Sequence, residues 1–163
     1  SLDQVIFIPS AKTPLKECGP MASDADRLQM LELALCDEPG ISVDDSEIRR
    51  GGVSYSIETI RAYRMSRPDT QLFWIIGADQ LRQLDSWRGI EEIVKMISFM
   101  VFGRPGFELS APAIPGLEWI AIDAPLMDES SSAIRNRISG GSPVDGLLPP
   151  AVETFIRDNG LYT

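Results

Sequence analysis

The apolar positions of this chain form short continuous runs that alternate with segments of helical spacing. The clearest run extends from Phe73 to Ile76, stops at Gly77 and is followed by Asp79. A short run bounded by turn residues is typical of a strand covered on both faces. Ligands bind beyond the carboxyl ends of strands in open α/β sheets, which makes Asp79 a candidate binding residue. On these residues alone, an ordinary strand followed by a turn is the better interpretation.

Further apolar runs predict strands at residues 5–9, 41–43, 99–102 and 118–122. Apolar residues at helical spacing predict helices that begin near residues 23, 56, 86, 130 and 149. Strands and helices therefore alternate along the chain, which predicts an α/β fold with a mostly parallel sheet covered on both faces. The length of 163 residues fits a single domain spanning 1–163.

Polar residues at two predicted helix starts are candidates for binding an anion. The first group is Ser54, Tyr55 and Ser56, and the second is Ser130–Ser132 with Arg135 one turn later. The free N–H groups and positive dipole end of a helix favour a carboxylate or phosphate. Plain N-capping is the better local interpretation of the first group. The second group fits a polyphosphate site and a capped surface helix equally well.

Three other residues stand where such folds place binding groups. Lys16 follows the first strand in a loop that also contains Lys12, and Arg104 follows the strand that ends at Phe102. Both lysines could instead be solvated side chains. Trp87 comes soon after Asp79, where it would serve equally well as a core filler or as a surface that stacks on a planar ring.

The composition excludes several kinds of partner. The apolar content of 44% and charged content of 24% are ordinary, and no apolar run has the length of a membrane span. No secretory signal is visible, so we expect a cytoplasmic protein. The net charge of −9 argues against a nucleic-acid partner, because phosphate backbones bind basic faces. A small anionic ligand remains compatible with a local cluster of positive charge.

The sequence contains no histidine and two cysteines. The absence of histidine removes imidazole-based acid–base catalysis and the commonest metal ligand, and we predict no metal site in the protein. Neither cysteine has metal-type spacing. We expect Cys18 and Cys36 to be free thiols and Cys36 to pack as a small apolar residue.

Seven stretches in order resemble the bacterial nicotinate-mononucleotide adenylyltransferases, and the resemblance runs from end to end of the chain. Each stretch is weak alone, but their order makes the resemblance specific. The stretches are Val5–Lys16, Arg49–Thr59, Ile75–Asp79, Trp87, Arg104–Gly106, Ser130–Arg135 and Asp158–Tyr162. The resemblance implies a Rossmann-like, doubly wound nucleotidyltransferase fold. It also implies a reaction of ATP, with Mg²⁺, and nicotinate mononucleotide that gives deamido-NAD and pyrophosphate.

The resemblance also implies roles for the candidate residues. Ser54, Tyr55 and Ser56 would receive the nicotinate carboxylate, Trp87 would stack on the pyridine ring, and Asp79 would hold nucleotide hydroxyls. Lys16 would lie near the mononucleotide phosphate and is the remaining candidate for a catalytic group. The residues implied for ATP binding are Gly77, Asp79, Arg104, Ser131, Ser132 and Arg135.

One departure from the family is large. The family begins with a strand, a turn carrying Gly-x-Phe-Asp-Pro-x-His-x-Gly-His and a helix, none of which is found in this sequence, and Leu15 stands where many relatives have a further histidine. We therefore expect an N-terminally truncated fold that is inactive or impaired as given. We also expect the remaining sheet to close up, either by re-pairing its strands or by pairing with another copy in a homo-oligomer.

Other functions stay open from the sequence. The chain could be a non-catalytic nucleotide-binding or regulatory module that has kept the acceptor site. It could also be an adenylyltransferase of the same superfold for nicotinamide mononucleotide or phosphopantetheine, although the pairing of residues 54–56 with Trp87 favours the nicotinate acceptor. The plainest alternative is an α/β interaction domain whose motifs no longer bind anything.

Overall fold

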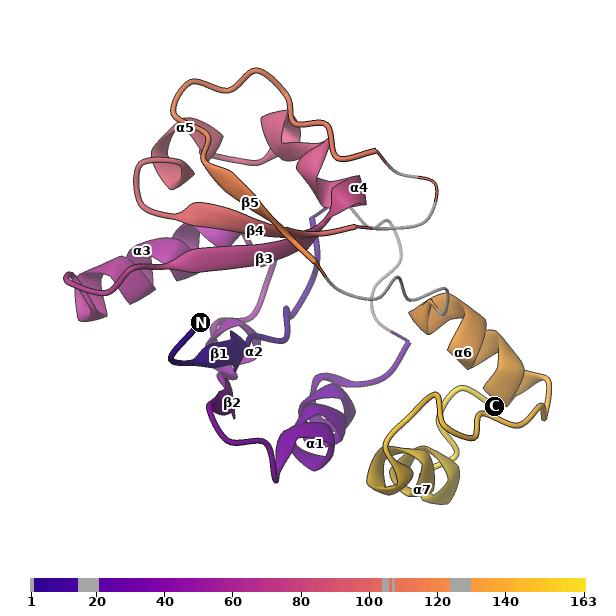
Figure 1. Ribbon diagram of the computed structural model, residues 1–163. Helices are drawn as coiled ribbons and strands as arrows, with labels where there is room; N and C mark the ends of the chain where they lie inside the picture. The colour runs from indigo at the N-terminus through magenta and orange to yellow at the C-terminus, as the bar shows by residue number, and fades with distance from the viewer. Residues whose placement is uncertain (1, 15–20, 104–105, 107, 124–129) are drawn as a thin grey trace. The chain divides into compact units, whose positions relative to one another are not determined.

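The computed structural model describes residues 2–14, 21–103, 106, 108–123 and 130–163. The chain divides into two compact units (Figure 1), of which the first contains Ser1–Ser54 and Glu129–Thr163 and the second contains Tyr55–Asp128. The prediction of a single domain stays a prediction. Lys16, Arg104 and Cys18 lie outside the described residues.

The first unit combines a two-stranded parallel sheet with four helices. Strand β1 (Val5–Phe7) pairs with β2 (Ile41–Val43), so that Val5 lies opposite Ile41. The helices are α1 (Asp24–Leu35), α2 (Ser46–Arg50), α6 (Ser131–Ser139) and α7 (Pro150–Asp158). Helix α1 contacts α7 and β2. Val152 and Ile156 of α7 are buried, as the apolar spacing predicted.

The second unit holds a three-stranded parallel sheet in the order β3-β4-β5. Figure 1 shows β4 between its two neighbours. The strands are β3 (Phe73–Gly77), β4 (Ser98–Phe102) and β5 (Trp119–Ile122). The helical segments are α3 (Ser56–Ser66), α4 (Ala78–Leu81), the 3-10 turn η1 (Leu84–Ser86) and α5 (Ile90–Ile93).

All strand pairs in the described part of the chain are parallel, which confirms the predicted α/β class. The described strands form one parallel sheet in each unit, β1-β2 in the first and β3-β4-β5 in the second. The expectations that the remaining strands re-pair into a closed sheet, or pair with a second copy of the chain, both stay predictions.

The core of the second unit lies between one face of its sheet and the helical segments. Phe99 and Val101 of β4 are fully buried, and Ile60 of α3 and Ile93 of α5 pack into the same cluster. Alternate residues of a strand point to opposite faces, so Phe99 and Val101 enter the core together. Trp74 and Trp119 pack against the cluster from β3 and β5.

The helix predicted to start near residue 86 begins later than its apolar pattern suggested. Ser86 does not cap it; instead Ser86 ends η1, and its hydroxyl donates a hydrogen bond of 2.7 Å to the carbonyl of Gln83, the residue before η1. Helix α5 starts after Gly89, whose φ of 73° lies in the left-handed region that glycine tolerates best. A Cβ at this position would come within 3.3 Å of the Ile57 side chain. Gly89 therefore both turns the chain and admits Ile57 to the core.

Cys36 also differs from expectation, because it is exposed rather than packed as a core residue. It is the residue immediately after α1, and its thiol lies 3.4 Å from a carboxylate oxygen of Asp37. This hydrogen bond raises the pKa of the Cys36 thiol. None of the described helices is both long and apolar enough to cross a membrane.

An ion pair links α3 to α5 on the surface of the second unit. The Arg61 guanidinium donates to both carboxylate oxygens of Glu92, at 2.7 and 2.5 Å, and both side chains are about half exposed. The hydrogen bonds from Arg61 lower the pKa of Glu92 in the folded chain. In acid the unfolded chain therefore binds more protons than the folded chain does. The stabilisation from this pair is present above the pKa of Glu92 in the unfolded chain, and it is lost as the pH falls through the pKa of Glu92 in the folded chain.

We therefore expect Glu92→Gln to lower the urea midpoint of unfolding slightly at pH 7. The difference from the wild type should shrink as the pH falls below the ordinary glutamate pKa of about 4.3. Added salt should reduce it as well, because the pair is exposed. Glu91→Gln removes the same charge from the adjacent position and serves as the control. A difference that stayed constant down to low pH would contradict this assignment.

Candidate functional site

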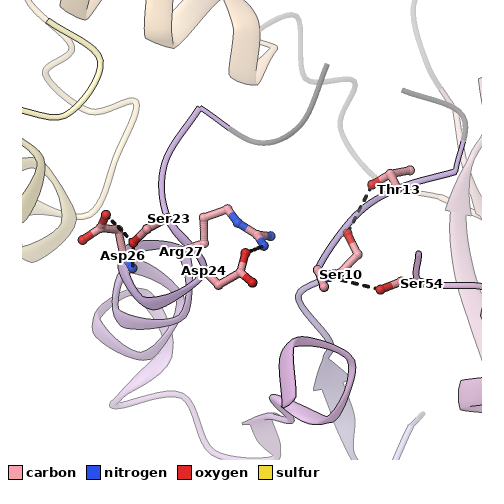
Figure 2. Close-up of polar contacts among 8 residues, drawn as sticks. Ser10, Thr13, Ser23, Asp24, Asp26, Arg27 and Ser54 are labelled. Atoms are coloured by element: carbon pink, nitrogen blue, oxygen red, sulfur yellow. Dashed lines mark hydrogen bonds and ion pairs between the residues drawn. The ribbon is translucent and has the colours of Figure 1, made fainter. Parts of the chain in front are cut away.

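Ser54 fixes the loop that follows β1. Its side chain is buried, and its hydroxyl oxygen accepts a hydrogen bond of 3.0 Å from the Ala11 amide. The Ser54 amide in turn donates to the Lys12 carbonyl at 2.9 Å. Figure 2 shows the hydrogen bond to the Ser54 hydroxyl and, beside it, the contact between the hydroxyls of Ser10 and Thr13. These two hydroxyl oxygens lie 3.2 Å apart. Ser54 thus has a structural role that the sequence did not reveal, and its role in ligand binding stays a prediction.

The next two residues of the predicted acceptor group begin α3. Tyr55 precedes the helix and Ser56 is its first residue. The Tyr55 ring packs against the core cluster of the second unit, and the Arg88 guanidinium lies 4.6 Å from the centre of that ring. A cation over the face of a tyrosine ring is attracted by the ring's quadrupole. This contact places a positive charge beside Tyr55, and no pattern in the sequence predicted it.

Trp87 joins η1 to α5 and packs against the same cluster as Tyr55. Its indole meets the ring of Phe99 edge to face, with the centroids 6.1 Å apart and an interplanar angle of 79°. Its Nε1 atom is buried and has no hydrogen-bond partner among the described residues. Buried indole N–H groups usually have a partner. Trp87 is therefore a partly buried residue that packs against the core, and its stacking on a ligand ring stays a prediction.

The strand end that carries Gly77 and Asp79 has the predicted form. Gly77 is the last residue of β3, and Asp79 lies in the first turn of α4. Val101 and Phe102 of β4 pair with Ile76 and Gly77, so two strands end side by side at this edge. The structure thus brings Tyr55, Ser56, Gly77, Asp79 and Trp87 into one compact unit.

The predicted phosphate-binding residues lie together on α6 of the first unit. The Ser130 hydroxyl accepts the Ala133 amide at 3.1 Å and caps the helix. Ser131 and Ser132 supply the next amides, which precede the first i to i−4 bond of the helix. The Arg135 guanidinium donates to the Ser132 hydroxyl at 3.1 Å and so folds back toward the helix start. This geometry suits an anion with several oxygen atoms.

No group of three or more histidine, cysteine, aspartate or glutamate side chains in the described part of the chain could hold a metal ion. The described residues therefore do not form an all-protein cage. Mg²⁺ is commonly bound through one or two carboxylates together with substrate phosphates, and Asp79 is a carboxylate of the candidate site.

Comparison with known proteins identifies the family. The Cytidylyltransferase-like family profile matches residues 1–137. A probable nicotinate-nucleotide adenylyltransferase of Opitutus terrae is 38% identical over 162 residues, which cover 99% of this chain and 83% of the relative. A probable nicotinate-nucleotide adenylyltransferase of Herpetosiphon aurantiacus is 39% identical over 167 residues, covering 99% of this chain and 84% of the relative. This chain belongs to the nicotinate-nucleotide adenylyltransferase family.

A solved structure supports the fold. The nicotinic acid mononucleotide adenylyltransferase of Plasmodium falciparum, complexed with NaAD, aligns with a TM-score of 0.79 over 99% of this chain and 83% of that chain. The sequence identity is 15%, so this likeness concerns the fold alone. It confirms the nucleotidyltransferase fold predicted for this member of the nicotinate-nucleotide adenylyltransferase family.

Proposed function

We propose that the chain binds nicotinate mononucleotide and ATP and serves the transfer of an adenylyl group between them. An oxygen of the mononucleotide phosphate attacks the α-phosphorus of ATP, the bond to the β-phosphate oxygen breaks, and deamido-NAD and pyrophosphate form. The observation that carries the proposal is the 38% identity with a probable nicotinate-nucleotide adenylyltransferase over 99% of the chain.

The acceptor roles follow the chemistry of the second unit. Ser56, at the first turn of α3, offers amide and hydroxyl donors to the nicotinate carboxylate, and Ser54 and Tyr55 precede it in the chain. Trp87 offers an aromatic ring to the pyridine, and the carboxylate of Asp79 accepts hydrogen bonds from ribose hydroxyls. The nearby Arg88 adds a positive charge that favours the carboxylate of nicotinate mononucleotide over the uncharged carboxamide of nicotinamide mononucleotide.

The remaining roles concern the phosphates. Ser131, Ser132 and Arg135 at the start of α6 would bind ATP phosphates, together with Arg104. Lys16 would neutralise the mononucleotide phosphate, and Gly77 would let the nucleotide approach the backbone. Mg²⁺ would arrive with ATP and neutralise its phosphates. Such a transfer depends mainly on positioning and on charge neutralisation, which these groups supply.

A calorimetric titration of this chain tests the proposal. These 163 residues contain no histidine, so we expect weak turnover and measure binding rather than activity. Nicotinate mononucleotide should bind clearly more tightly than nicotinamide mononucleotide, and ATP with Mg²⁺ should bind separately. Equal affinity for the two mononucleotides would overturn the proposed substrate. Failure of a folded chain to bind any nucleotide would overturn the function.

A further inference from the structure

The chain after α7 folds back in a conformation that costs free energy. Leu161 donates its amide to the Ile156 carbonyl at 3.0 Å, and Gly160 turns the chain with a φ of 59°. Tyr162 follows with a φ of 65°, and it is the only non-glycine residue with a positive φ in the described part of the chain. The left-handed region is unfavourable for residues with a side chain. Such strain persists only where surrounding contacts hold it.

The contact that accompanies this strain is made with α6. The Tyr162 side chain reaches Arg135, whose guanidinium carbon lies 6.0 Å from the centre of the tyrosine ring. Figure 1 shows the C-terminal segment running back from α7 toward α6. The same guanidinium donates to the Ser132 hydroxyl at 3.1 Å. Arg135 is therefore held by one contact from its own helix and one from the end of the chain.

The tyrosine acts in this contact as an uncharged ring. Tyr162 is partly buried, and this burial raises the pKa of its phenol, although the charges of Arg135 and Arg27 lower it and that of Asp26 raises it. The phenol therefore remains protonated near neutral pH. The attraction is then between a cation and an aromatic ring, and a phenylalanine ring would preserve it.

We propose that Tyr162 is a positioning residue, which holds the Arg135 guanidinium at the start of α6 ready for a phosphate of ATP. The proposal rests on the proposed function for the identity of the ligand. An arginine side chain has many rotamers, and fixing it before the ligand arrives lowers the entropy lost on binding. The strained backbone of Tyr162 would then be maintained because it brings the ring to Arg135.

Two substitutions separate the ring from the phenol hydroxyl. Tyr162→Leu removes the aromatic face and should weaken ATP binding about twofold to fivefold, the usual strength of an exposed cation–π contact. Tyr162→Phe should bind ATP as the wild type does. In the free chain, nitrogen-15 relaxation of the Arg135 Nε–H group should show a lower order parameter in Tyr162→Leu and an unchanged one in Tyr162→Phe.

The controls distinguish this role from a general effect on stability. In the Tyr63→Leu variant, which removes a tyrosine ring 5.4 Å from the Arg67 guanidinium, ATP affinity should not change. In an Arg135→Ala background, Tyr162→Leu should have no further effect on ATP affinity. An additional loss in that background would overturn the proposal.

The relaxation measurement keeps the two hypotheses apart. An unchanged order parameter for Arg135 in Tyr162→Leu overturns the positioning role, even if ATP binds. If Arg135 loses order in this variant but the wild-type chain does not bind ATP, the contact is confirmed and the proposed function fails.

Discussion

Replacing Phe99 with alanine is expected to lower the free energy of unfolding by about 3–5 kcal/mol. Phe99 is fully buried in β4, the middle strand of its sheet, and its ring meets that of Trp87 edge to face. The substitution removes the buried ring and leaves a cavity that a parallel sheet can fill only partly. Urea unfolding followed by tryptophan fluorescence measures the loss. It is a large part of the 5–15 kcal/mol that is typical of a folded domain.

The matched control is Phe102→Ala in the same strand. Phe102 is 38% exposed, so its replacement removes less buried apolar surface. It should therefore lower the free energy of unfolding clearly less than Phe99→Ala does. Equal losses from the two variants would show that Phe99 does not occupy the core of the second unit. The fluorescence of Phe99→Ala should also change in the native state, because its cavity adjoins Trp87.

Replacing Trp87 with leucine is expected to weaken nicotinate mononucleotide binding by about 5-fold to 150-fold. The estimate comes from aromatic stacking on a nucleobase, which is worth about 1–3 kcal/mol. Leucine retains apolar volume against the core cluster that Trp87 contacts, but it has no planar face and no indole N–H. The loss of binding free energy measured by calorimetry should therefore be much larger than the loss of unfolding free energy measured in urea.

A second variant identifies which part of Trp87 matters. Trp87→Phe keeps an aromatic face and removes only the Nε1 donor, which is buried without a partner among the described residues. If stacking dominates, this variant should bind nearly as well as the wild type. A Trp87→Phe variant as weak as Trp87→Leu would assign the effect to the N–H donor. Unchanged affinity in both would leave Trp87 as a core residue alone.

The sequence predicted the strands and most helices because their apolar patterns are local. The run from Phe73 ends at Gly77 as expected, and Ile57 and Ile60 of α3 are both buried. The start of α5 could not be predicted in the same way, because it depends on the left-handed φ of Gly89 and on its fit against Ile57. These are tertiary constraints, and they override a continuous helical pattern.

The candidate site was predictable in its residue types more than in its contacts. Polar groups at strand and helix ends made Asp79, Ser56 and Ser131 candidates, and the structure places each of them in the first turn of a helix, while their ligand contacts stay predictions. The sequence did not predict that Ser54 would hold the Ala11 amide, or that Arg88 would lie over Tyr55. Such contacts join residues from different segments of the chain, so the periodicity of apolar positions does not predict them.

The exclusively parallel pairing of the described strands has a consequence for how fast the chain can fold. Val5 pairs with Ile41 and Phe73 with Ser98, so each pairing closes a long loop before it gains a single ladder bond. Non-local contacts of this kind slow folding, because the loop-closure entropy is lost first. During synthesis, β3 cannot pair until β4 has been made, and the apolar side chains of β3 stay exposed to solvent until then. Folding yield should therefore depend on chaperones more strongly than the final stability would suggest.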